Sequence, residues 1–558
     1  MALPPPLDHV TPRSATTLVE QCLAHIDNEL AALAESMRTL RSRRNSFARI
    51  SCLPSEILAT VFRHIVEDEL SLHHYRTSQR PPGLVVTHVC RHWRRVALEY
   101  PSLWAFIIRS SARWIGIMLE RSKKAALVVR CNISILSPDC MEQVLSQLPR
   151  IKVLHLELYA PDINRVLGYL TSQPAPLLQV FKFSVVGDSY RRTTSPISDN
   201  IFQGQVPQLR SLELQSCGFS WTSCIFFSGL RNLCLKGIGF PTTLPEFLPA
   251  LRRMPGLEQL TIERLSVNWG KDTVSLDRAP LLQLRSIVLD VTIQTAIALF
   301  AHLALPDDVK ISLNLTRIKD RQSFSDLFSA MDKVPSKLGP VVLSAYATFS
   351  PPRFSVQFSK SMKREPLSFW NVLNDDIRLS IQFSWDSYIA NQLSITFDIC
   401  RMATQSKIRS LSVSSSSVNL EPHFWRTGST NLPEVEEIHL TGGFIGGLLA
   451  VLKVGGTQSA DIAYQSLREL DVEDVDFLEC DTLDLHEIIN MRRGLSVPIC
   501  VLRFMDCRGI MTSDVELLED VVEEVEWDGL EESLESETES YNSCQCPQCR
   551  DADVDVYF

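Results

Sequence analysis

Three closely spaced cysteines near the C-terminus could bind a metal ion. Cys544, Cys546 and Cys549 occur in the run SCQCPQCR. Thiolates at this spacing resemble half of a zinc site and would bind a soft metal. A fourth ligand is missing nearby, because His486 or Cys507 could supply it only if the tail folded back. Free tail thiols are therefore the favoured interpretation, and the sequence predicts no metal and no other cofactor.

Two further segments resemble catalytic motifs in part. The run GGFIGG at Gly442 stands between a predicted strand and a predicted helix, which is the setting of a dinucleotide-binding loop. Phe444 occupies the place of that motif's second glycine, so a tight turn is favoured. His486-Glu487 continues with Ile-Ile-Asn, so the second histidine of a metalloprotease helix is absent. We find no P-loop, nucleophile elbow or kinase signature in the sequence, and we predict that the chain is not an enzyme.

Two apolar stripes near the N-terminus predict a pair of helices. Pro54 suits the first position of a helix, where its missing N–H costs nothing. The first stripe consists of Ile57, Leu58, Val61, Phe62 and Ile65. The second consists of Val86, Val89, Cys90, Trp93, Val96 and Ala97, and Arg91, Arg94 and Arg95 flank it. A loop with Pro81, Pro82 and Gly83 separates the two stripes, and Pro101 ends the second helix.

The segment from Ile50 to Ile107 resembles an F-box, in the form common in fungal F-box proteins. The match rests on Leu53-Pro54-Ser55-Glu56-Ile57-Leu58, on Val89-Cys90-Arg91-His92-Trp93-Arg94, and on Ala97, Pro101, Leu103 and Trp104. The loop 68–84 extends the spacing between the two halves, as is usual in that form. The match covers about a tenth of the chain.

This resemblance implies a substrate-recognition subunit of an SCF-type cullin ubiquitin ligase, joined to the cullin by a Skp-type adaptor and binding a protein substrate of unknown identity. It also implies which residues bind the adaptor: Leu53, Pro54, Ile57 and Leu58, with Val89, Cys90 and Trp93 from the second helix. The residues themselves point the same way, because the apolar face exceeds what one small three-helix unit can bury. The alternative is core packing, which we favour for Val61, Phe62, Val96 and Ala97.

Short apolar-polar-apolar segments recur from about residue 127 onward and predict half-buried strands. They begin at Val153, Leu209, Leu230, Leu257, Leu284, Ile408, Val435, Leu467 and Cys500. Equivalent positions Leu212, Leu233, Leu260 and Ile287 lie 21, 27 and 27 residues apart, and Leu411, Ile438, Leu470 and Leu502 lie 27, 32 and 32 apart. Such spacing is typical of slightly long leucine-rich repeats. Residues 315–380 are less regular. Strand-like runs begin at Ile311, just before this range, and at Val341 and Leu379 within it.

We therefore predict an α+β fold, with a small all-α F-box followed by an α/β leucine-rich-repeat solenoid. The expected parts are a disordered segment (1–17), an amphipathic helix (18–45), the F-box (46–108), the repeat domain (109–530) and an acidic disordered tail (531–558). The boundary after Leu530 allows for a last strand in VVEEVEW, which ends at Trp527.

The predicted helix 18–45 carries Val19, Leu23, Ile26, Leu30, Leu33, Met37 and Leu40 at alternating spacings of four and three. One interpretation is a coiled-coil dimerisation helix. The other is a helix that packs its stripe against the next domain. Three heptads are near the lower limit for a coiled coil, which favours the packed helix.

Composition places the chain in the cytoplasm, the nucleus or both. The 15 cysteines are scattered singly through a long chain, as in reduced proteins. Residues 514–555 hold 16 acidic residues and one basic residue, so the rest of the chain is near +5 and gives no reason to expect nucleic-acid binding. No apolar run is long enough to cross a membrane. The rival function is a leucine-rich-repeat scaffold that is not attached to a ligase.

Overall fold

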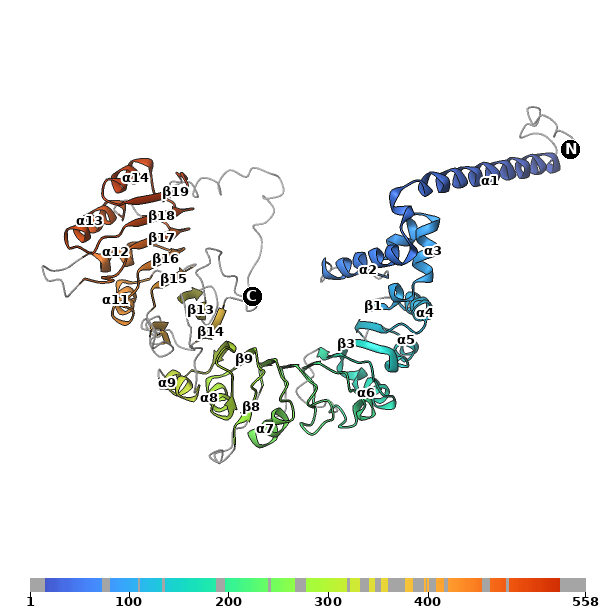
Figure 1. The fold of residues 1–558 in the computed structure, drawn as a ribbon, viewed down its shortest axis with the longest axis horizontal. Coiled ribbons are helices and arrows are strands. Elements are labelled where there is room, and N and C mark those ends of the chain that lie inside the picture. The colour runs from blue at the N-terminus through green and yellow to red at the C-terminus, as the bar shows by residue number, and fades with distance from the viewer. Residues whose placement is uncertain are drawn as a thin grey trace, which may run out of the picture. The chain divides into compact units, whose positions relative to one another are not determined.

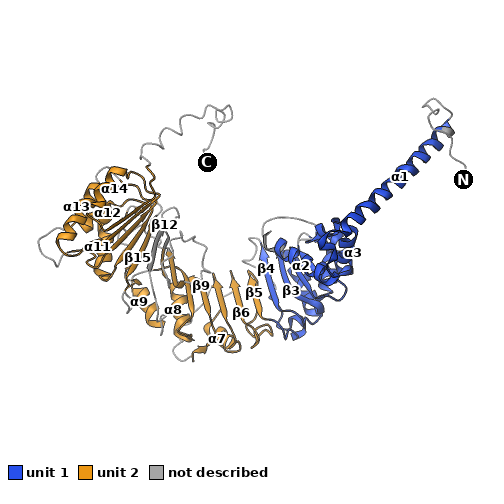
Figure 2. Cartoon of the chain, turned by 45° about the horizontal axis from the view of Figure 1, so that its top comes forward, with its two compact units in different colours: residues 1–209 blue, residues 210–558 orange. Residues whose placement is uncertain are grey.

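The computed structural model forms two compact units, residues 1–209 and 210–558 (Figure 2), and each is considered by itself. It describes residues 16–72, 81–108, 111–132, 136–186, 196–238, 242–265, 277–318, 322–331, 341–346, 353–359, 377–384, 396–397, 399–400, 408–415, 420–453, 462–477 and 481–531. The division falls inside the predicted repeat domain (109–530), so strands of that region belong to both units. The predicted disordered segment 1–17 lies almost entirely outside the described residues.

Unit 1 begins with helices (Figure 1). They are α1 (Thr16–Ser46), the 3-10 helix η2 (Arg49–Cys52), α2 (Ser55–Leu72), the 3-10 helix η3 (Leu84–His88), α3 (Arg91–Glu99) and the 3-10 helix η4 (Pro101–Trp104). The predicted loop 68–84 is shorter than expected, because α2 continues to Leu72. The backbone N–H of Gly83 donates to Glu69 Oε2 at 2.8 Å and so ties the end of the connection to α2.

The core between α2 and α3 is aromatic and aliphatic. Leu58, Phe62 and Val66 are fully buried along one face of α2. The Phe62 ring lies 4.9 Å from the ring of Trp93 in α3. Trp104 is buried as well, and its indole N–H donates to the carbonyl of Ala97 at 2.8 Å. These contacts fix the two predicted helices against each other and against η4.

A parallel sheet completes unit 1. Its strands are β1 (Phe106–Ile108), β2 (Leu127–Asn132), β3 (Ile151–Tyr159) and β4 (Val180–Val186), paired in that order. The accompanying helices are α4 (Ala112–Arg121), α5 (Pro138–Leu145) and α6 (Ile163–Ser172). Only β3 was among the predicted strands. The strands β1, β2 and β4 were not among them.

Unit 2 contains a larger, mainly parallel sheet. Its strands are β5 (Ser211–Gln215), β6 (Asn232–Lys236), β7 (Gln259–Glu263), β9 (Ser286–Thr292), β11 (Lys310–Thr316), β12 (Val341–Tyr346), β13 (Arg353–Ser359), β14 (Ile377–Ser384), β15 (Ser410–Ser415), β16 (Glu437–Thr441), β17 (Glu469–Glu473), β18 (Val501–Met505) and β19 (Glu524–Trp527). Two short strands, β8 (Ala279–Pro280) and β10 (Leu303–Ala304), pair with each other.

The predicted equivalence of the leucine positions is confirmed by the register. Leu212 pairs with Leu233, Leu233 with Leu260, and Leu260 with Ile287. In the second series Leu411 pairs with Ile438, Ile438 with Leu470, and Leu470 with Leu502. All of these side chains are buried, so each position adds one residue to a continuous row in the core. Burial of one face in every unit is what specifies this register.

The less regular middle of the chain departs from the simple parallel order. The strand-like runs at Ile311, Val341 and Leu379 are confirmed as β11, β12 and β14. In space the order is β11, β14, β13, β12, β15, the reverse of the chain order between β11 and β15. The strand β13 was not predicted, and it is antiparallel to both of its neighbours.

The described helices of unit 2 lie along one face of the sheet, and no described helix covers the other face, which we call the open face (Figures 1 and 2). They are α7 (Leu244–Arg252), α8 (Ile293–His302), α9 (Gln322–Ala330), α11 (Pro422–Asn431), α12 (Gly446–Leu452), α13 (Asp481–Gly494) and α14 (Thr512–Glu519). The strands bury alternate residues, as predicted for half-buried strands. The chain is thus a mixed α and β protein, with N-terminal helices and a large parallel sheet.

The boundary predicted after Leu530 lies next to the end of the described residues, which stop at Glu531, and it stays a prediction. The predicted last strand is confirmed as β19, which pairs in parallel with β18. Glu531 also belongs to the folded part, because its Oε1 accepts the backbone N–H of Thr512 at 2.9 Å. The Thr512 hydroxyl donates to the same oxygen. A carboxylate at the first residue of α14 satisfies a free N–H and complements the helix dipole. The remainder of the acidic tail lies outside the described residues.

Replacing Glu531 with alanine is expected to lower the thermal midpoint of unit 2 near neutral pH. Hydrogen bonds from the Thr512 side chain and backbone hold the pKa of Glu531 below its ordinary value. A carboxyl group whose pKa is lower in the folded chain than in the unfolded chain stabilises the fold at pH values above the unfolded pKa. This stabilisation is lost as the pH falls through the folded pKa. The difference between Glu531→Ala and wild type should therefore shrink on acidification. Calorimetric scans from pH 7 to pH 3 measure it, and a constant difference would contradict this cap.

Burial keeps several thiols protonated. It raises the pKa of Cys131 and Cys217 to about 12, and Cys400 is shifted in the same direction by burial. No disulfide joins the cysteines of the described residues. Among the described helices, none has the length and apolar character needed to span a bilayer.

Candidate functional site

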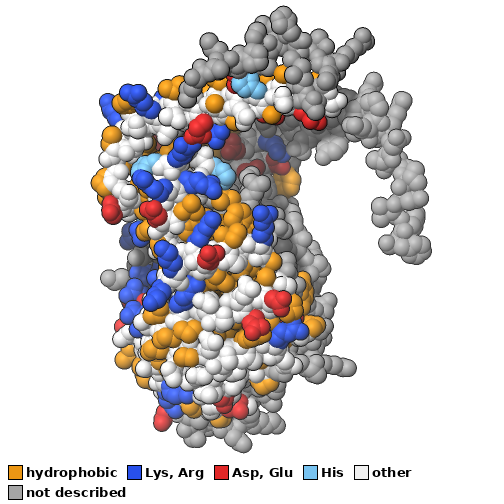
Figure 3. Space-filling view, turned by 90° about the vertical axis from the view of Figure 1, so that its right-hand side faces the viewer, with side chains coloured by type: hydrophobic (Ala, Val, Ile, Leu, Met, Phe, Trp, Pro, Cys, Tyr) orange, Lys and Arg blue, Asp and Glu red, His pale blue; other side chains and the backbone are white. Residues whose placement is uncertain are grey.

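The predicted partner-binding residues at the start of α2 form an exposed apolar surface. Ile57 is 51% exposed, Pro54 is exposed and Leu53 is half-buried. These residues precede or open the helix, so their side chains lie outside the core formed further along α2. Single exposed apolar side chains are normal at a protein surface, whereas several of them together can mark an interaction site. Figure 3 shows hydrophobic side chains at the surface beside several Lys and Arg side chains.

The residues predicted around α3 differ in exposure. Val89 is 53% exposed, whereas Cys90 and Trp93 are half-buried. The Trp93 ring contacts Phe62, so part of it belongs to the core and part remains accessible. Trp93 therefore contributes to the core, and its predicted contact with a partner stays a prediction.

Leu58 requires a correction. Its side chain is 0% exposed, and it packs on the same face of α2 as Phe62. A fully buried side chain cannot contact a partner without opening the domain, so Leu58 belongs to the core. Val96 and Ala97, for which core packing was favoured, are buried as expected. Phe62 is buried too, while Val61 is half-buried.

Three further exposed apolar residues of this N-terminal region were not predicted. Phe47 and Ile50 lie in the connection between α1 and α2, and Val85 lies in η3. Each is more than two-fifths exposed, and Phe47 is 77% exposed. Val85 stands next to Val86 in the sequence, and of this apolar pair Val86 is buried and Val85 is exposed. We use "the exposed apolar surface" as a collective name for the exposed or half-buried apolar residues Phe47, Ile50, Leu53, Pro54, Ile57, Val85 and Val89.

Local backbone structure fixes the two helix starts that carry this surface. The carbonyl of Pro54 accepts the N–H of Leu58 at 3.0 Å, which is the first helical hydrogen bond of α2. Cys90 is the N-cap of α3, and its Sγ accepts the backbone N–H of Trp93 at 3.4 Å. A side-chain acceptor at this position satisfies a backbone donor that the helix leaves free. The cap also explains why Cys90 is only half exposed.

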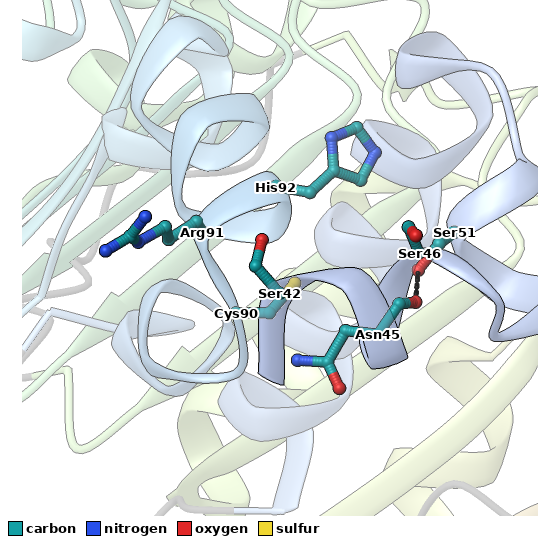
Figure 4. Close-up of a pocket in the computed structure, with 7 residues that line it drawn as sticks. All are labelled: Ser42, Asn45, Ser46, Ser51, Cys90, Arg91 and His92. Carbon is teal, nitrogen blue, oxygen red and sulfur yellow. Dashed lines mark hydrogen bonds between the residues drawn. The ribbon is translucent and has the colours of Figure 1, made fainter. Parts of the chain in front are cut away.

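A small polar cavity lies between the end of α1, η2 and the start of α3 (Figure 4). It has a volume of about 260 Å³ and is lined by Ser42, Asn45, Ser46, Ser51, Cys90, Arg91 and His92. The Ser51 hydroxyl donates to the carbonyl of Asn45 at 2.8 Å across it. The cavity is below the usual size of a small-molecule site. It provides no reason to predict a ligand.

The glycine-rich run GGFIGG forms a tight turn, as the sequence favoured. Gly442 and Gly443 have positive φ values of 73° and 77°, and the turn joins β16 to α12. The N–H of Gly442 donates to the carbonyl of Glu473 at 2.9 Å. The carbonyl of Gly443 accepts the N–H of Asp476 at 3.0 Å. These groups join neighbouring strand-helix units and are not arranged around an open phosphate site.

The metal candidates from the sequence do not converge within the described residues. His486 lies in α13 and Cys507 is buried just after β18. No group of three or more potential metal ligands occurs in the part of the chain that the structure describes. Cys544, Cys546 and Cys549 lie outside the described residues, so their role stays a prediction.

The apolar stripe of α1 is exposed to solvent, which contradicts the interpretation favoured from the sequence. Leu23, Ile26, Leu30, Leu33, Met37 and Leu40 are all between 41% and 64% exposed. The helix runs from Thr16 to Ser46 and extends away from the rest of unit 1 (Figures 1 and 2). The stripe therefore does not pack on the described residues of the next domain. Hydrophobic periodicity showed which face is apolar, but it could not show what covers that face.

The open face of the sheet in unit 2 is the other surface of functional interest. Across β16, β17 and β18 its outward side chains include Glu437, His439, Glu469, Asp471, Glu473 and Arg503. Arg503 Nη1 lies 2.8 Å from Asp471 Oδ1 and 3.0 Å from Glu469 Oε2. Burial alone would raise the pKa of Asp471, but hydrogen bonds from His439 and Arg503 hold it below its ordinary value. The face is thus charged and pre-organised by ion pairs across three strands.

Comparison with known proteins assigns no family to this chain. No protein-family model matches it, and a search of curated proteins finds no relative. The function proposed below therefore rests on the residues and surfaces described above.

Proposed function

We propose that this chain is the substrate-recognition subunit of an SCF-type cullin ubiquitin ligase. In this proposal the helices around α2 and α3 are an F-box that binds the Skp-type adaptor, and through it the cullin. The observation that carries the proposal is the exposed apolar surface at the two helix starts. It lies where the F-box-like residues Leu53, Pro54, Ile57 and Val89 were identified in the sequence.

The contrast between neighbouring residues supports a partner site. Leu58, Phe62 and Val66 bury one face of α2, while Ile57 leaves its side chain half exposed on the same helix. The core of this small unit is therefore complete without the exposed residues. Apolar groups that the core does not need fit the apolar centre of a protein interface.

Charges around the surface add to its specificity. Arg91, Arg94 and Arg95 on α3 are exposed. A partner with an acidic rim would be attracted to this side of the helix, and the association rate would then fall with added salt. The proposed binding mode is an apolar contact at the helix starts with charged contacts at its edge.

The remainder of the chain would hold the target protein. We propose that its strand-helix units are leucine-rich repeats that form a solenoid. The recurring leucine positions, in register at intervals of 21 to 32 residues, support this assignment. Repeat proteins bind partners with wide open faces, and the open face of the unit 2 sheet is the natural candidate. The mechanism is positional, because the chain brings a target close to a ubiquitin-loaded enzyme elsewhere in the complex.

The rival proposal is a repeat scaffold without a ligase, in which the N-terminal helices only cap the repeats. The exposed apolar surface favours the ligase proposal, since a cap would bury its apolar residues against the first repeat. The two are separated by affinity capture of the full chain from cells in which the ligase is inhibited. The ligase proposal expects adaptor and cullin in the captured material, together with a target protein. Capture of partners without adaptor or cullin would favour the scaffold.

A further inference from the structure

We propose that α1 is a homodimerisation helix that pairs antiparallel with α1 of a second copy of this chain. This inference is independent of the proposed ligase function. It begins from the six exposed side chains of the α1 stripe: Leu23, Ile26, Leu30, Leu33, Met37 and Leu40. Their alternating spacings of three and four place them at the a and d positions of a heptad, which form the seam of a coiled coil.

The opposite face of α1 is the one attached to its own domain. Glu35 Oε1 lies 3.2 Å from Arg91 Nη2 of α3. Ser42, one heptad further along, lines the polar cavity next to α3 (Figure 4). Residues 35 and 42 are at the f position, on the far side of the helix from a and d. The contact with α3 therefore leaves the stripe residues from Leu23 to Leu40 exposed.

Charge determines the orientation of the pair. Residues 16–31 hold the three acidic residues Glu20, Asp27 and Glu29 and no lysine or arginine, giving −3. Residues 32–46 hold four arginines and one glutamate, giving +3. Parallel pairing would place like charges together, whereas antiparallel pairing places each half against its opposite.

The antiparallel register is also fixed by the stripe. Pairing Leu30 with Leu33 of the second copy at the centre brings Leu23 opposite Leu40 and Ile26 opposite Met37. In the same register Glu20 of each copy lies beside Arg41 of the other copy. Both residues are at positions that flank the seam. Every one of the six stripe residues then meets an apolar partner.

The buried area suffices for a dimer. A helix of 31 residues is about 46 Å long, which is enough for three heptads. Six large apolar side chains per copy, each at least two-fifths exposed, would bury on the order of 1,000 Å² in total, about the area a biological interface needs. The α1 helix of a second copy therefore fits both the length of the apolar stripe and the charge distribution along α1.

The first test is the oligomeric state of the full chain, measured by size-exclusion chromatography with light scattering. Wild type should be dimeric at micromolar concentration, and Leu30→Lys with Leu33→Lys should weaken association at least about 100-fold. The control, Gln21→Lys with Asn28→Lys, adds the same charge at f positions and should remain dimeric. The helix content of each variant is checked by circular dichroism. A monomeric wild type, or a dimer unaffected by the stripe variant, would overturn the proposal.

The second test addresses orientation. Arg41→Glu should weaken an antiparallel dimer about tenfold, because it opposes Glu20 of the second copy, and adding Glu20→Arg should restore the affinity. In a parallel dimer Arg41→Glu would instead relieve repulsion between basic halves and tighten association. Cross-linking with Arg43→Cys gives a direct readout. An intermolecular link between Cys22 and position 43 supports the antiparallel pair, and its absence from a cross-linked dimer would overturn it.

Discussion

Replacing Ile57 with aspartate is expected to reduce adaptor binding by at least about 100-fold while the chain stays folded. Ile57 is 51% exposed on α2, so the substitution leaves the core formed by Leu58 and Phe62 intact. In the proposed complex, however, the new carboxylate would have to lose its water against an apolar surface. Such desolvation costs several kcal/mol when no cation pairs with the group. A loss of about 3 kcal/mol corresponds to the stated change in affinity.

The matched control is Leu483→Asp in α13 of unit 2. Leu483 is 60% exposed, so the control makes the same chemical change at a similarly accessible side chain. It should leave adaptor affinity and thermal stability unchanged. Val89→Asp, at the other helix start, should weaken binding in the same way as Ile57→Asp. Equal adaptor affinity for Ile57→Asp and wild type would place the interface elsewhere.

Replacing Gly447 with alanine is expected to destabilise unit 2 by about 3 kcal/mol, the upper end of the usual cost of overpacking. A Cβ at this position would lie 1.9 Å from the backbone oxygen of Leu420. Because the obstructing atom belongs to the backbone, no side chain can rotate away, and α12 must move from the segment before α11. In calorimetry of the full chain, the midpoint of the unit 2 transition should fall by about 4 °C.

Gly446 provides the control in the same helix. A Cβ there would have Asp481 Oδ1 as its nearest neighbour at 3.6 Å, an ordinary contact. Gly446→Ala should therefore be neutral or slightly stabilising, since alanine favours a helix more than glycine does. Similar midpoints for the two variants would show that α12 does not approach Leu420 so closely.

The parallel sheet was largely predictable from the sequence because each strand buries alternate residues. Leu212 and Leu411 each begin a row whose later members pair in the predicted register. The middle was harder, because β13 runs antiparallel to both neighbours and interrupts the repeat. Glu531 was missed for a different reason. Its contact with Thr512 joins residues 19 positions apart, and no periodic pattern reveals such a cap.

The candidate site was predictable in its location but not in the role of each residue. Helical spacing placed Ile57 and Leu58 in one apolar stripe, yet one is half exposed and the other is fully buried. Adjacent residues on a helix point about 100° apart, so a broad stripe includes both core and edge positions. The stripe of α1 posed the converse problem, since its pattern suited either a packed helix or a paired one.

Direct binding of the purified full chain to a purified Skp-type adaptor tests the central claim. Isothermal titration calorimetry should give a complex of one adaptor per chain with at least micromolar affinity. Binding should carry a negative heat-capacity change, because apolar surface is buried. The Ile57→Asp variant should show no measurable heat under the same conditions, and Leu483→Asp should match wild type. Absence of binding by the folded wild-type chain would contradict the assignment of an F-box.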